Sequence, residues 1–135
     1  MKFNIKWGYN NIRIKDRDQW KAAFMTNEGL FEPTVMFFGL TNSPTTFQTM
    51  MNTIFRDLIV NRSMMVYMND MAIHTARRPD ETEDNHVTQH RSTVNQVLQK
   101  LNDHNLYLNL EKCNFEQPHI DFLGVQVVHR MVQME

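Results

Sequence analysis

The sequence predicts an α+β domain in which two helices pack on one face of an antiparallel sheet. Two stretches carry apolar residues at helical spacing, one after Pro44 and one between Asp80 and Asn105. Short apolar runs bounded by turn residues lie around them and indicate hairpins. Helices that alternate with hairpins, rather than with single strands, are typical of this class. The length of 135 residues allows one domain, and an apolar content of 41% suffices for a core.

The front of the chain has the pattern of strands. Tyr9–Ile14 alternates apolar and polar side chains, which predicts a strand, and residues 16–18 form a turn. Trp20–Met25 and Leu30–Phe37 are predicted to pair as a hairpin. The connecting residues end in Gly29, which tolerates the backbone angles of a tight turn.

The first helix has a clear start and a clear buried face. Ser43 occupies the predicted N-cap position, and Pro44 occupies the first helical position, where proline is well tolerated. The apolar residues that follow recur every three or four positions and define one buried stripe. They are Phe47, Met50, Met51, Ile54, Phe55, Leu58 and Ile59.

A second hairpin follows the first helix. Met64–Tyr67 and Met71–Thr75 are predicted strands, and the residues between them include Asn69 and Asp70, which favour turns. A polar loop, Arg77–Glu81, then leads to the second helix.

The second helix is predicted to start near Asp80, with Glu83 completing a capping box, and to stop at Asn105. Its apolar face consists of Val87, Val94, Val97, Leu98 and Leu101. Leu106–Leu110 and Phe122–Val128 are predicted as the last strands.

Composition excludes several classes of protein. With 14 basic and 15 acidic residues the net charge is −1, which argues against a uniformly basic nucleic-acid-binding domain. A single cysteine, Cys113, excludes an internal disulfide framework and a zinc knuckle. There is no signal-peptide pattern and no apolar run that could span a membrane, so we expect an intracellular protein, cytoplasmic or nuclear. The basic residues nevertheless gather at the front, at Lys2, Lys6, Arg13, Lys15, Arg17 and Lys21.

Five ordered motifs make the interpretation more specific. They are Trp20-Lys21-Ala22-Ala23-Phe24, Phe37-Phe38-Gly39-Leu40-Thr41-Asn42-Ser43-Pro44 with Thr46-Phe47-Gln48, Tyr67-Met68-Asn69-Asp70, Leu108-Asn109-Leu110-Glu111-Lys112-Cys113, and Phe122-Leu123-Gly124. In this order and spacing they resemble the reverse transcriptase of gypsy-type LTR retrotransposons, close to the fungal variety. The resemblance runs from about Phe3 to Val128.

The resemblance implies a reverse-transcriptase palm with a partial fingers hairpin, at about residues 15–37, in one domain covering residues 1–135. Compared with that family, the thumb, connection and RNase H are expected to be absent. The implied activity is RNA-directed DNA polymerisation, by in-line nucleotidyl transfer with two Mg²⁺ ions. The implied partners are an RNA or DNA primer-template and a deoxynucleoside triphosphate, with no membrane. Uncovered palm surface also predicts homo-oligomers.

The resemblance further implies a damaged catalytic centre. The family places three aspartates where this chain has Asn4, Asn69 and Asp70. An amide oxygen brings no negative charge to a metal ion. Asp70, with the carbonyl of Ile5, is therefore expected to hold Mg²⁺ or Mn²⁺ weakly or not at all, and polymerisation is expected to be lost or very weak.

Other matched positions imply a nucleotide pocket and a primer grip. Tyr9, Phe38 and Lys112 fall at nucleotide-binding positions, and Leu123 and Gly124 fall at the primer grip. Plainer readings stay open. Asn69-Asp70 also suits an ordinary hairpin turn, Tyr9 suits an ordinary strand aromatic, and the first helical stripe is typical of core. His86 and His90 lie one helical turn apart, without a third metal ligand.

The chain is rich in Met, which occurs 11 times, and in Asn. At several of these positions, a single G-to-A codon change would convert the residue of the resembled motif into the residue of this chain. This pattern predicts a degenerate copy that drifted under cytosine deamination. A deliberate double mutation at Asn4 and Asn69 is the alternative.

A second functional hypothesis is non-enzymatic: a domesticated or relic module that binds nucleic acid or protein through the basic front.

Overall fold

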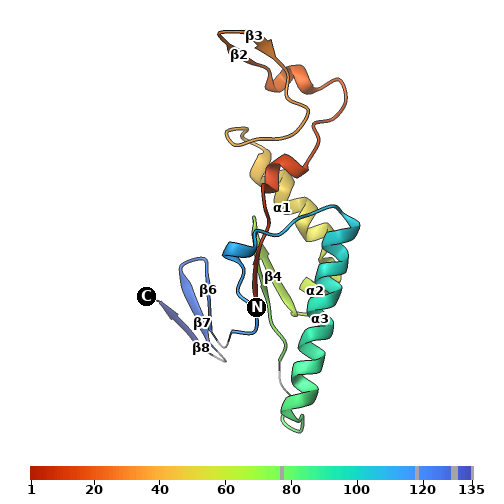
Figure 1. Cartoon of the computed structure of the whole chain (residues 1–135), viewed down its shortest axis with the longest axis vertical. Helices are drawn as coiled ribbons and strands as arrows, with labels where there is room; N and C mark the ends of the chain where they lie inside the picture. Colours follow the sequence, from red (N-terminus) through yellow and green to blue (C-terminus); the bar gives the residue numbers. More distant parts are fainter. Residues whose placement is uncertain (77, 118, 129–130, 135) are drawn as a thin grey trace.

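The computed structural model describes residues 1–76, 78–117, 119–128 and 131–134. Its centre is a three-stranded antiparallel sheet of β1 (Lys2–Asn4), β5 (Asp70–Ile73) and β4 (Met64–Tyr67), in the order β1-β5-β4 (Figure 1). Residues 107–114 run along the free side of β1, where Lys2 pairs with Asn114 and Ile5 with Leu108. The N-terminal strand therefore lies between two segments that are distant in sequence.

The two faces of this sheet differ in character. Phe3 pairs with Met71, and both are fully buried in the main core. Side chains alternate along a strand, so the residues on either side of these two point to the opposite face. That second face, called here the open face, carries Lys2, Asn4, Met65, Tyr67, Asp70 and Ala72.

The predicted first helix is two helices. The first, α1, spans Ser43–Ile54, and α2 spans Arg56–Val60, with Phe55 between them. The predicted stripe is confirmed, because Phe47, Met51, Phe55 and Leu58 are buried. Residues Met50, Ile54 and Ile59 pack partly against them.

The predicted N-cap of α1 is wrong by one residue. The cap position belongs to Asn42, without a side-chain cap bond. Ser43 is instead the first helical residue and is fully buried, and its hydroxyl donates a hydrogen bond of 3.1 Å to the carbonyl of Phe37. The hydroxyl therefore ties the helix to the preceding chain rather than to its own amides.

The predicted second helix is α3, Glu83–Asp103. Its cap is Thr82, whose hydroxyl accepts from the amide of Asn85, so the start predicted near Asp80 is wrong. The predicted end is confirmed: Asn105 takes a left-handed conformation, with φ of 54°. The amide of Asn105 donates to Asn102, and that of Leu106 donates to Leu101, which is the Schellman arrangement. The loop predicted before α3 begins at Arg77, which lies outside the described residues.

The front segment forms less strand than predicted. Tyr9–Ile14 begins as a 3-10 turn, η1 (Gly8–Asn11), and Trp20 lies in another, η2 (Gln19–Ala22). Only β2 (Phe24–Thr26) and β3 (Gly29–Phe31) form the hairpin, which extends away from the central sheet (Figure 1). Ile12–Ile14 is extended and pairs briefly with residues 34–36. Alternation alone does not make a strand where so few residues have a partner.

The C-terminal part forms a separate small sheet. Its strands are β6 (His119–Phe122), β7 (Val125–Val128) and β8 (Met131–Met134). Leu123 and Gly124 form the first turn, with φ of 55° and 75°, so both residues are left-handed as in a type I′ turn. The predicted strand Phe122–Val128 therefore covers the end of one strand, a turn and a second strand. Ile120 and Phe122 pack on Ala72 of the open face.

The strand predicted over Leu106–Leu110 is also wrong. This segment makes one bridge, through Leu108, and then enters the 3-10 turn η3 (Leu110–Lys112). None of the helices in the described part of the chain is long and apolar enough to cross a membrane.

Two histidines fasten the first half of α3 to the end of β5. His86 Nε2 lies 2.9 Å from the carbonyl oxygen of Thr75, and His90 Nδ1 lies 2.9 Å from the Thr75 hydroxyl. Burial lowers the pKa of His90, and the charges of the N-terminal amino group, His86 and His74 lower this pKa further, whereas Glu116 raises it. Burial also lowers the pKa of His74.

These pKa directions predict a fold that acid weakens. Because the folded pKa values lie below the unfolded value of about 6.5, the folded state binds fewer protons than the unfolded state. Stability should be full above that value and should fall as the pH drops through it toward the folded pKa. Urea unfolding at about pH 7.5 and about pH 5.5 measures this. His90→Gln should reduce the pH dependence, whereas the control His104→Gln, at an exposed position, should leave it unchanged. An equal dependence in His90→Gln would refute this assignment.

Candidate active site

Asn4 and Asp70 are direct neighbours on the open face. They lie opposite each other in the pairing of β1 with β5. Asn4 Nδ2 donates to Asp70 Oδ1 at 3.0 Å, and Lys2 Nζ lies 3.9 Å from the same oxygen. The Asp70 side chain is 31% exposed. One carboxylate thus faces one amide and one ammonium group, so this part of the site has no net charge.

Asn69 lies beside this pair in the β4–β5 turn. The turn is the two residues Met68 and Asn69, and Met68 is left-handed with φ of 52°. The carbonyl of Asn69 accepts from the amide of Ile5 at 2.8 Å, which ties the turn to the end of β1. Its side-chain Oδ1 is buried and has no hydrogen-bond partner within the described part of the chain.

Gly8 makes room for the Asn69 side chain. A Cβ atom on Gly8 would collide with Asn69 Oδ1 and would lie 2.9 Å from the ring of Phe47. The Asn69 amide therefore lies against the glycine backbone, close to the fully buried Phe47.

Gln48 of α1 holds the same turn from the other side. Its Oε1 accepts from the amide of Met68 at 2.7 Å, and its Nε2 donates to the carbonyl of Val66 at 3.1 Å. Nε2 also lies 2.9 Å from Asn52 Oδ1, which fixes the orientation of the amide. Because β4 is at the edge of its sheet, this side chain satisfies the two backbone groups that a further strand would pair with.

Gln48→Glu should therefore weaken the turn. The carboxylate keeps an acceptor for Met68 but loses the donor to Val66, and it places negative charge against that carbonyl and Asn52. We expect a loss of about 1–3 kcal/mol in the free energy of unfolding, measured in urea. Gln96→Glu, on the exposed side of α3, is the matched control and should change stability by less than about 0.5 kcal/mol. Equal effects of both variants would contradict this role for Gln48.

The predicted nucleotide-binding residues are partly brought together. Tyr9 is buried, and its ring lies 4.8 Å from that of Phe38 and 5.8 Å from that of Phe47, both edge-on. Phe38 is 74% exposed, so the outer ring of this aromatic group faces solvent. Lys112 is exposed on η3 and makes no ion pair with another described residue.

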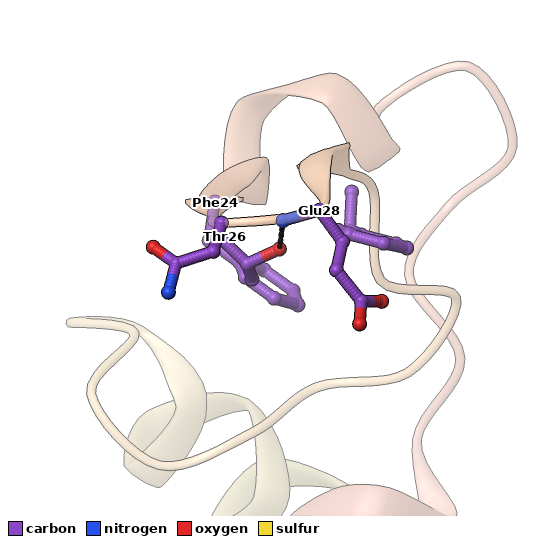
Figure 2. A pocket seen from close by; sticks show the side chains of 5 residues that line it. Phe24, Thr26 and Glu28 are labelled. Carbon is purple, nitrogen blue, oxygen red and sulfur yellow. Dashed lines mark hydrogen bonds between the residues drawn. The ribbon is translucent and has the colours of Figure 1, made fainter.

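Leu123 and Gly124 belong to the separate β6–β7 turn, and Leu123 is exposed. The hollow drawn in Figure 2 lies on the β2–β3 hairpin, between Phe24, Phe31 and the tip residues Thr26, Asn27 and Glu28, and so belongs to another part of the surface. In it the Glu28 amide donates to the Thr26 hydroxyl at 3.1 Å.

Sequence reasoning missed three residues of the site. Lys2 could have been found, because it lies two positions before Asn4 and therefore on the same strand face. Gly8 and Gln48 give no local signal for their contacts, since their partners are far away in sequence.

The comparisons with known proteins agree with this arrangement. Residues 1–127 match the family described as reverse transcriptase (RNA-dependent DNA polymerase), and the chain belongs to that family. It is 35% identical over 126 residues to the Transposon Tf2-3 polyprotein of Schizosaccharomyces pombe, and 37% identical over 117 residues to the Retrovirus-related Pol polyprotein from transposon 297 of Drosophila melanogaster. These matches cover 93% and 87% of this chain but only 9% and 10% of the relatives.

Solved structures show the same fold. The foamy viral protease-reverse transcriptase in complex with RNA/DNA hybrid superposes with a TM-score of 0.83 at 18% identity, over 99% of this chain and 17% of the other. A related structure in complex with double-stranded DNA gives 0.84 at 19% identity, over 99% and 22%. The predicted α+β reverse-transcriptase palm fold, with helices packed on an antiparallel sheet, is confirmed.

The residues present do not fit the two divalent ions that the family implies. Mg²⁺ prefers anionic oxygen ligands. Here the single carboxylate, Asp70, already accepts from Asn4 and lies near Lys2, and the Asn69 oxygen is neutral. Among residues 1–76, 78–117, 119–128 and 131–134, no three His, Cys, Asp or Glu side chains are grouped as metal ligands.

Proposed function

We propose that this chain is the palm of a gypsy-type, fungal-like retrotransposon reverse transcriptase whose polymerase activity is lost or very weak. The ordered motifs and the two transposon relatives support the origin. The observation that carries the loss of activity is the hydrogen bond of 3.0 Å from Asn4 to Asp70, where the family has two facing acids.

The expected loss follows from charge. Three carboxylates would give −3 to balance the +4 of two Mg²⁺ ions, whereas Asn4, Asn69 and Asp70 give −1. Removing one group that stabilises transition-state charge typically costs about 2.7–4 kcal/mol, or about 10²–10³ in rate. Two such losses leave little catalysis.

A primer-extension assay tests this function. The chain is incubated with a poly(rA)/oligo(dT) primer-template, a deoxynucleoside triphosphate and either Mg²⁺ or Mn²⁺. We expect no extension above a control without protein. Processive synthesis by the unaltered chain would refute the proposal.

A second candidate is a module that binds nucleic acid without catalysis. The basic front favours it: Lys2 lies on the open face beside Asp70, and Arg13, Lys15, Arg17 and Lys21 have exposed side chains at the base of the β2–β3 hairpin. Lys21 also pairs with Asp18 at 2.7 Å, so its charge is partly offset. An RNA/DNA hybrid is the probe of choice, because a solved reverse transcriptase of the same fold is in complex with one.

Fluorescence anisotropy of a labelled hybrid measures this second function. Binding should weaken steeply with salt, since each phosphate contact releases counterions. Arg13→Gln with Lys15→Gln should flatten the salt dependence. Arg56→Gln with Arg62→Gln, at exposed positions in and just after α2, removes the same charge and is the matched control. Binding that does not change with salt, or that the control pair weakens equally, would contradict the assignment.

We also propose that the copy is degenerate through one-directional drift rather than through two chosen mutations. The excess of Met and Asn along the whole chain supports this, because a double mutation accounts for Asn4 and Asn69 only. Sequencing an intact genomic copy tests it, and substitutions without a G-to-A bias would count against drift.

A further inference from the structure

The amide at position 4 does more than remove a metal ligand. Asn4 and Asp70 are directly opposed, and their strands pair segments far apart in the chain. The Asn4 carbonyl also accepts from the amide of Asn109 at 2.8 Å, so Asn4 contacts both neighbouring segments of β1. The side-chain bond to Asp70 thus reinforces the point where residues 4, 70 and 109 meet.

An aspartate at position 4 would reverse the interaction. Two ionised carboxylates are acceptors only, so neither could donate to the other. Like charges directly opposite each other in a sheet are destabilising, and Lys2, 3.9 Å from Asp70, is one cation for two acids. Such a pair is less stable than the amide–carboxylate pair unless a further cation lies beside it.

An aspartate at position 69 would be destabilising as well. The Asn69 Oδ1 atom is buried, and no described residue donates a hydrogen bond to it, which a neutral amide oxygen tolerates far better than an ionised carboxylate does. A charge at this place, against Gly8 and Phe47, would also be destabilising unless a cation lay beside it. Both asparagines therefore suit a palm that folds in the absence of divalent ions.

We propose that Lys2, Asn4 and Asp70 form a clamp between β1 and β5, named here the cross-strand clamp, which stabilises this palm without a bound Mg²⁺ ion. The inference deepens the proposed function, since it concerns the same site. Its test reads stability rather than catalysis, so the two can fail separately.

Thermal unfolding of the whole chain, in a chelator and in Mg²⁺, tests the clamp. The unaltered chain should have the same Tm in both conditions. Asn4→Asp should lower the Tm in chelator by about 5–10 °C, because it removes a charge-assisted hydrogen bond and adds repulsion, and Mg²⁺ should restore part of the loss. Asn95→Asp, at an exposed position of α3, adds the same charge and should do neither.

A swapped pair keeps the test decisive if Asn4→Asp does not fold. In the double variant Asn4→Asp with Asp70→Asn, donor and acceptor change places and the total charge is unchanged. This variant should fold in chelator with a Tm close to that of the unaltered chain. A swapped variant that stays unfolded would overturn the clamp.

Two further results would overturn it. One is an Asn4→Asp variant as stable in chelator as the unaltered chain. The other is an unaltered chain whose Tm rises with Mg²⁺. Primer extension by the unaltered chain would refute the proposed function and leave these melting curves as they are, so the two failures are distinguishable.

Discussion

Phe47→Ala is expected to lower the free energy of unfolding by about 3–5 kcal/mol. The Phe47 side chain is 0% exposed and meets the edge of Tyr9 at a ring distance of 5.8 Å. Its ring also lies next to Gly8, whose backbone contacts the Asn69 side chain. Truncation would leave a cavity between α1, η1 and the β4–β5 turn, so one change should loosen both the core and the candidate site. A domain has only about 5–15 kcal/mol in total, so this variant should be marginally folded.

Urea unfolding followed by circular dichroism measures this effect. The matched control is Phe38→Ala, because Phe38 touches the same Tyr9 ring but is 74% exposed. It should lose less than about 1.5 kcal/mol. A Phe47→Ala variant within about 1 kcal/mol of the unaltered chain would show that this packing is not what the structure describes.

Restoring the two acids is expected to have the largest effect on activity. Asn4→Asp with Asn69→Asp returns two anionic ligands to the open face and should raise single-nucleotide incorporation at least about 100-fold. The assay is best made with the chain in place of the matching segment of the Tf2-3 polyprotein, because this chain spans 9% of that relative. The rest of the polyprotein is then identical in every version compared.

Three versions of this chimera separate the causes. The one with Asn4 and Asn69 should be silent, the one with two aspartates should extend the primer, and Asn95→Asp should be as silent as the first. Equal extension by the asparagine and aspartate versions would mean that these positions do not limit catalysis. All three reaction mixtures should contain Mg²⁺, which should also stabilise the version with the restored acids.

Sequence alone predicts the parts of this fold whose chemistry is local. The stripe from Phe47 to Leu58 needed only helical spacing. The β4–β5 hairpin needed only two apolar runs and a turn, although its second strand is Asp70–Ile73 rather than the predicted Met71–Thr75. Asn105 ends α3 because it tolerates the left-handed conformation that the Schellman arrangement requires. In each case the neighbouring residues decide the outcome.

The predictions that failed depend on partners elsewhere in the chain. Tyr9–Ile14 and Leu106–Leu110 alternate like strands, but the first begins as a 3-10 turn and the second makes a single bridge. The sequence predicts Ser43 as the N-cap of α1. Its hydroxyl instead donates to the carbonyl of Phe37, which explains why Ser43 is buried as the first helical residue.

The candidate site shows the same division. Resemblance of motifs, rather than periodicity, suggested that Asn4 and Asp70 belong together, and the structure adds the hydrogen bond between them. The two hydrogen bonds between Gln48 and the β4–β5 hairpin cannot be predicted from local sequence, because Val66 and Met68 lie 18 and 20 positions away. Lys2 changes the charge of the site, whereas the sequence alone places it only in the basic front.

Paramagnetic broadening by Mn²⁺ tests most directly whether this palm lacks a metal centre. In a two-dimensional NMR spectrum of the unaltered chain, Mn²⁺ bound at the open face would broaden the signals of Asn4, Asn69 and Asp70 first. We predict that these signals broaden no more than those of exposed acids such as Asp103, whereas the variant with both aspartates restored shows selective broadening around Asp70. Selective broadening at these three residues in the unaltered chain would contradict the account.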